Sequence, residues 1–212
     1  MGFFEKIVPR TLVGLLLGWV LMGPTSAAGT SPAATVATLN QALVAAMQSG
    51  ALGGFEGRKA ILGPAIREAF DMPFVARLTL GRHGRNLTEQ QHADFAARFS
   101  RIVIATYVSR FKLYDGERFV VVSERPLKQG RRLVQTEVID RDGDKVALDY
   151  MLQQKDGAWY IVNVVAEGIS ELSLRRAEYT AVINREGFTA LLVKLDEQVV
   201  KLTGKTSASG TS

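Results

Sequence analysis

The side chains that could perform metal or nucleophilic chemistry are few in this sequence. It has two histidines, His83 and His92, and no cysteine. The lack of cysteine excludes disulfides, thiolate metal ligands and thiol nucleophiles. Because no cluster of carboxylates at ligand spacing supplements the histidines, we expect neither a metal site nor another cofactor.

Motifs for covalent or phosphate chemistry are missing as well. The sequence contains no GxSxG nucleophile elbow. The glycine-rich stretch 50–57 does not lie between a strand and a helix, as a phosphate-binding loop does. One enzymatic alternative remains, in which Asp149, Tyr150 or His92 acts as acid or base. It requires polar groups that converge inside a cavity.

The elements that would position any site are helical in the first half of the chain. Apolar residues at helical spacing predict helices over residues 33–47 and 58–70. Asp71 is expected to cap a short helix that includes Leu78, and Thr88 to cap a long helix that ends near Lys112. Glycines at 50–57 predict a break between the first two helices.

The second half of the chain alternates with the period of strands. Strands are predicted over residues 118–124, 132–140, 145–153 and 159–165, with Asp-Gly turns at 142–143 and 156–157. Helices over 171–184 and 188–202 follow. This order predicts an α+β fold in which a four-stranded antiparallel sheet is wrapped by helices, with an apolar cavity between the sheet and the helices.

Continuous apolar runs at 119–122, 161–162 and 164–165 suggest the cavity, because a sheet with one wet face should alternate. Such runs mean that both faces are covered, or that one face lines an apolar hollow. An ordinary solid core is the alternative. The candidate lipid-binding residues are the large apolar side chains on the sheet and the facing helices: Phe74, Leu78, Phe99, Val103, Tyr107, Val122, Val138, Tyr150, Trp159, Ile161 and Tyr179.

The N-terminus has the pattern of a cleaved signal peptide over residues 1–28. Lys6 and Arg10 precede a short apolar stretch, and Ser26 to Ala28 supply small residues for cleavage. We expect export to the periplasm, a single domain over 29–204 and a flexible polar tail over 205–212. The net charge is only +5 and the basic residues are dispersed, so a nucleic-acid partner is not expected.

The last third of the chain resembles the MlaC-like family of periplasmic lipid-binding proteins, also called the toluene-tolerance family. The residues that carry the resemblance are Trp159, Glu167-Gly168-Ile169-Ser170, Arg176, Tyr179 and Gly187. The segment Phe70 to Phe99 is also similar to the family. Asn163 and the pair Arg175-Arg176 depart from the MlaC branch, and "LSLRRAEYTAVI" looks more like the hopanoid-associated HpnM branch.

This resemblance implies a non-catalytic carrier of a hopanoid or a phospholipid, with an inner-membrane lipid transporter as its partner and a monomeric state. Lipid tails would lie between sheet and helices. Glu167, Gly168, Ser170 and Arg176 are expected to hold the fold, whereas Arg175 or Arg176 could meet a head group at the pocket mouth. A pocket-free interaction subunit of an envelope complex is the third alternative.

Overall fold

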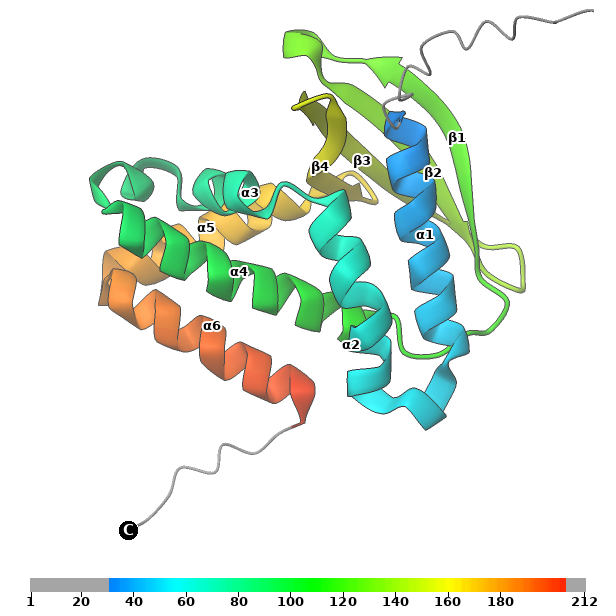
Figure 1. Cartoon of the computed structure of the whole chain (residues 1–212), viewed down its shortest axis with the longest axis horizontal. Coiled ribbons are helices and arrows are strands. Elements are labelled where there is room, and N and C mark those ends of the chain that lie inside the picture. The colour runs from blue at the N-terminus through cyan, green and yellow to red at the C-terminus, as the bar shows by residue number, and fades with distance from the viewer. Residues whose placement is uncertain (1–30, 205–212) are drawn as a thin grey trace, which may run out of the picture.

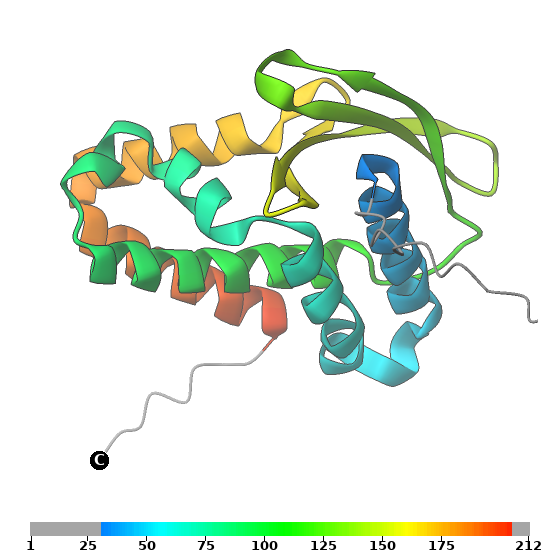
Figure 2. The same ribbon diagram turned by 45° about the horizontal axis from the view of Figure 1, so that its top comes forward.

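A computed structural model describes residues 31–204, apart from the side chains of Ala51 and Leu52. A curved sheet wraps around one helix, and a bundle of helices extends from it as an arm (Figures 1 and 2). The predicted signal peptide, residues 1–28, and the predicted tail, residues 205–212, lie outside the described residues. Within residues 31–204, no helix has the length and apolar character needed to span a membrane.

The helices follow the predicted order. They are α1 (Pro32–Gln48), α2 (Gly50–Ala69), α3 (Met72–Leu80), α4 (Glu89–Arg110), α5 (Glu171–Glu186) and α6 (Phe188–Thr203). Thr88 and Gln91 form a capping box at the start of α4, and Asp71 caps α3, as predicted. The glycines at 50–57 interrupt the helices, as predicted: Gly50, the first residue of α2, has a positive φ of 60°, and Gly54 kinks α2 with φ of 54° and ψ of −158°.

The sheet is antiparallel, with strands in the order of the chain. They are β1 (Arg118–Pro126), β2 (Arg132–Ile139), β3 (Lys145–Lys155), β4 (Ala158–Ala166) and β5 (Ile169–Ser170). The predicted α+β fold is confirmed, with five strands in place of four. The fifth is the two-residue strand that pairs with the end of β4 just before α5, too short to show alternation in the sequence.

Two of the three apolar runs contain a β-bulge, and β4, which carries the other run as well, lines an apolar pocket with Val162 and Val164. In β4, Val162 is skipped in the register with β3, so Ile161 and Val162 are both buried. In β1, the register shifts at Val122, but this strand lies at the sheet edge and Val122 is 57% exposed. The run in β1 therefore meets solvent, contrary to the expectation that both faces are covered.

Candidate functional site

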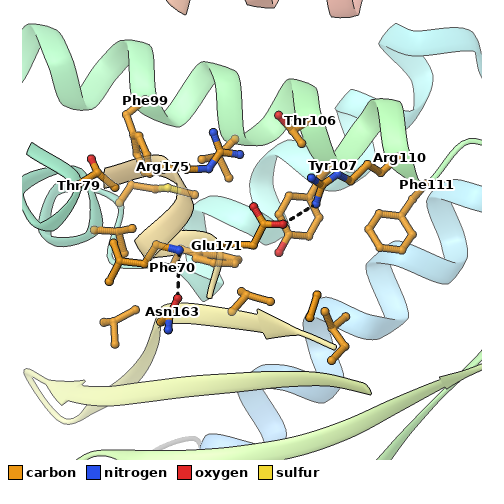
Figure 3. Close-up of a pocket in the computed structure, with 18 residues that line it drawn as sticks. Phe70, Thr79, Phe99, Thr106, Tyr107, Arg110, Phe111, Asn163, Glu171 and Arg175 are labelled. Atoms are coloured by element: carbon orange, nitrogen blue, oxygen red, sulfur yellow. Dashed lines mark hydrogen bonds and ion pairs between the residues drawn. The ribbon is translucent and has the colours of Figure 1, made fainter. Parts of the chain in front are cut away.

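An apolar pocket lies where the sheet meets the helical arm (Figure 3). Its floor comes from β3 and β4, and its walls come from α3, α4, α5 and the residues next to them. The lining side chains are Phe70, Met72, Val75, Thr79, Phe99, Val103, Thr106, Tyr107, Arg110, Phe111, Leu148, Val162, Asn163, Val164, Ala166, Glu171, Leu172 and Arg175. Most are aliphatic or aromatic, and the charged ones lie along the wall that α4 and α5 form.

The pocket is partly enclosed. The cavity measures about 100 Å³, which is small beside the roughly 300–1,000 Å³ that is usual for sites of drug-sized ligands. An apolar hollow of this kind gains its binding energy by removing hydrocarbon from water.

Two opposite charges pair on the wall that α4 and α5 form. Arg110 at the end of α4 donates from Nη1 to Oε1 of Glu171 at the start of α5, over 3.0 Å. Figure 3 shows Glu171 reaching from α5 toward Arg110 and Tyr107 of α4. Arg175 follows one helical turn after Glu171, and its guanidinium lies 6.0 Å from the centroid of the Phe99 ring. The only charged side chains of the lining thus come from α4 and α5.

Tyr107 contributes an aromatic wall that stays neutral. Its ring stacks on Phe111 at a centroid distance of 5.9 Å and meets Phe70 edge-to-face at 6.0 Å. Burial raises the pKa of the Tyr107 hydroxyl well above 10.0, and the carboxylate of Glu171 raises it further. The hydroxyl therefore remains protonated at physiological pH and adds no charge to the pocket.

The α5 wall is fixed to the sheet by its own cap. Ser170 accepts a hydrogen bond from the backbone N–H of Ser173 at 3.2 Å and donates to Oδ1 of Asn163 at 3.1 Å. The same amide oxygen accepts from the backbone N–H of Leu172 at 3.2 Å. Asn163 on β4 thereby sets where α5 begins, and with it the position of Glu171.

The opposite wall is fixed at the junction of α2 and α3. Asp71 lies between the lining residues Phe70 and Met72, and its carboxylate accepts from the backbone N–H of Phe74 at 3.1 Å and from Lys155 at 3.3 Å. Its own N–H donates to the carbonyl of Ile161 on β4 over 3.3 Å. Both walls of the pocket are therefore attached to the same strand.

The sequence of this domain matches the family described as MlaC protein over residues 37–197. That match covers both walls and the floor of the pocket. The chain belongs to the MlaC family.

A solved structure has the same architecture as this MlaC-family chain. It is a phospholipid-binding protein from Ralstonia solanacearum, determined in complex with a phospholipid. The two chains share 21% sequence identity with a TM-score of 0.70, and the match covers 80% of this chain and 97% of the other. At this identity the likeness supports the fold.

Three of the eleven residues predicted for the pocket of the MlaC-family chain line it: Phe99, Val103 and Tyr107, all on α4. They lie at helical spacing on the face of α4 that meets β4. Arg175, considered for a head group, is also in the lining, whereas Arg176 donates to the backbone carbonyl of Leu78 at 2.8 Å.

The other eight predicted residues do not line this pocket. Tyr150, Ile161 and Tyr179 are buried in the filled core, where Tyr150 lies 3.3 Å from Oδ1 of Asn40. Phe74, Leu78, Val138 and Trp159 are half-buried, and Val122 is exposed on the edge strand. Their role in lipid binding stays a prediction.

The residues of the enzymatic alternative lie on different parts of the MlaC-family chain. Asp149 accepts from Gln135 on one face of the sheet, while its neighbour Tyr150 points into the core on the other. His92 lies near the start of α4, beside Gly84. These three side chains form no joint site. Within residues 31–204, no group of three or more metal-ligand side chains gathers either.

Most lining residues were missed because their contacts depend on the fold. Val162 enters the lining only through the bulge, which shifts the faces of β4. Glu171 and Arg110 are 61 residues apart in the chain. A usable signal did exist for Glu171, since an acidic residue directly after the capping Ser170 marks the first turn of a helix.

Proposed function

We propose that this protein is a non-catalytic periplasmic carrier that holds one membrane lipid, with hydrocarbon in the pocket between β4 and helices α3, α4 and α5. The observation that carries the proposal is the apolar lining of a partly enclosed pocket in a chain of the MlaC family. Each methylene group that the pocket removes from water contributes about 0.8 kcal/mol. An acyl chain therefore gains binding energy in proportion to the number of methylene groups that the pocket covers.

A similar solved structure and the predicted signal peptide also support this assignment. The similar protein from Ralstonia solanacearum is described as phospholipid-binding and was solved with a phospholipid. The mature chain that follows the predicted signal peptide would face the periplasm, where lipid must cross an aqueous space between membranes. We propose an inner-membrane lipid transporter as partner, a phospholipid or a hopanoid as cargo, and a monomeric carrier.

The first test is the chemical identity of any bound molecule. The exported protein is purified from the periplasm without detergent, and an organic extract is analysed by mass spectrometry. The proposal predicts a lipid in a stoichiometric amount, and the mass distinguishes a phospholipid from a hopanoid. Protein that is consistently free of lipid, and that takes up none from vesicles, would contradict the proposal.

The second test fills the pocket from within. Val103→Phe adds a ring to the lining face of α4, and Val193→Phe adds the same ring at an exposed position on α6. We expect Val103→Phe to lower the amount of co-purified lipid severalfold while Val193→Phe retains it. Equal retention by both variants, with unchanged thermal unfolding, would mean that lipid binds elsewhere.

A further inference from the structure

A second hollow adjoins the pocket and shares a wall with it. This hollow is a groove between α4, α5 and α6 that opens to solvent and has a volume of about 460 Å³. The residues that line both hollows are Thr106, Arg110, Glu171 and Arg175. These four side chains thus stand between the apolar interior and an open, polar groove.

The ion pair in this wall is placed to be exchanged. The Glu171 side chain is 27% exposed and the Arg110 side chain 61%, so Glu171 is the more buried partner of the pair. A pair with one partner largely in water is held weakly. Another anion that reaches Arg110 from the interior can therefore replace Glu171.

The groove also holds positive charge that Glu171 does not balance. Arg175 donates to the hydroxyl of Tyr179 at 3.4 Å, and within residues 31–204 it forms no ion pair with a carboxylate within 4.0 Å. Lys201 of α6 lines the same groove. The other carboxylate of the groove, that of Glu178, accepts a hydrogen bond from Gln198 at 3.3 Å. The cations of the groove lining outnumber its anions even with Glu171 in place, and the excess grows once Glu171 turns away.

We infer that Arg110 and Arg175 bind the phosphodiester of a lipid head group, and that Glu171 occupies the position of that phosphate while the carrier is empty. Guanidinium groups suit phosphate because their forked donors match two of its oxygens. The inference rests on the proposed function, since it is the tails in the pocket that bring the phosphate to this wall.

The start of α5 adds little to this site. In its first turn, the backbone N–H groups of Leu172 and Ser173 already donate to Asn163 and Ser170. The two guanidinium groups are the cationic donors of the wall, and their removal should abolish the preference for phosphate.

The experiment uses three soluble ligands that separate head group from tail. Palmitoyl lysophosphatidylglycerol carries tail and phosphodiester, palmitoylglycerol carries the tail alone, and glycerophosphate carries the phosphate alone. Affinities are measured by isothermal titration of delipidated full-length mature protein, below micelle-forming concentrations. The readout is the ratio of the two tail-bearing affinities.

We expect the unaltered protein to prefer the phosphodiester by about tenfold, which is about 1.4 kcal/mol. The double variant Arg110→Gln, Arg175→Gln should bring the ratio close to one. Glu171→Gln should raise the ratio, because it frees Arg110 without changing shape, and misfolding cannot produce a gain. Arg101→Gln is the matched control: this arginine of α4 pairs with Asp196 at 2.7 Å, away from the wall, and should leave the ratio unchanged.

The outcomes separate this inference from the proposed function. Equal affinity of the unaltered protein for both tail-bearing ligands overturns the head-group site and leaves tail binding intact. No affinity for either one overturns the carrier itself. If glycerophosphate alone binds as tightly as the lysophospholipid, the site serves a soluble phosphate and the lipid assignment is wrong. A ratio that Glu171→Gln lowers would refute the exchange of carboxylate for phosphate.

Discussion

Replacement of Asp71 should measure how strongly the arm of helices is attached to the sheet. Its carboxylate is buried between the lining residues Phe70 and Met72, caps α3 and pairs with Lys155. Asp71→Ala removes both interactions, whereas Asp71→Asn keeps an oxygen that can accept from the backbone N–H of Phe74. The two variants therefore separate the cap from the ion pair.

The expected magnitudes follow from the two contacts. Loss of an N-cap costs about 0.5–2 kcal/mol. Loss of the ion pair costs less, about 0.2–1 kcal/mol, because the Lys155 side chain is 52% exposed. Asp71→Ala should thus lower the free energy of unfolding by about 1–3 kcal/mol and Asp71→Asn by under about 1 kcal/mol.

Thermal and urea unfolding of the delipidated protein check this prediction. In a domain of this size, each kcal/mol lowers the melting temperature by about 2–4 °C. We expect a loss of several degrees for Asp71→Ala and of one or two degrees for Asp71→Asn. If both variants lose the same amount, the cap to Phe74 is not what the carboxylate contributes, and the account of this junction is wrong.

Two further predictions concern stability. Burial raises the pKa of Tyr107, Tyr150 and Tyr179 above 10.0, so the folded state keeps protons that the unfolded chain releases. The contribution of these tyrosines to the free energy of unfolding should therefore be constant below about pH 10 and fall above it, and urea titrations at alkaline pH should find a shallower fall for Tyr150→Phe. Gly187 has φ of 88° and ψ of 169° between α5 and α6, a region nearly restricted to glycine. Gly187→Ala should cost about 1–3 kcal/mol in urea unfolding, whereas Gly57→Ala, within α2 and with open space around it, should be neutral or stabilising.

The order of helices and strands was predictable because local signals agree with the fold. Thr88 and Asp71 cap their helices where the sequence placed them, and the Asp-Gly pair at 156–157 turns β3 into β4. The chain departs from these local rules at Val162, where a bulge lets two successive side chains be buried. A bulge in a strand leaves no mark in the alternation.

The sequence predicted an apolar pocket between sheet and helices, but only some of the residues that line it. Phe99, Val103 and Tyr107 share one face of a long helix, so periodicity alone finds them. Whether a buried side chain such as Tyr150 borders a hollow or fills the core depends on a few ångströms of packing, which composition does not encode. The charged wall depends on α5 returning to the end of α4, a long-range contact.

The bulge in β1 has a consequence for the behaviour of concentrated protein. An edge strand offers unpaired backbone groups on which a second molecule can build a continuous sheet, and exposed valines strengthen such adhesion. Here the irregularity at Val122 spoils the spacing that an incoming strand would need, and Pro126 withholds a donor at the end. Deleting Val122 would remove the bulge and restore a regular edge strand, which would favour edge-to-edge pairing of one molecule with the next.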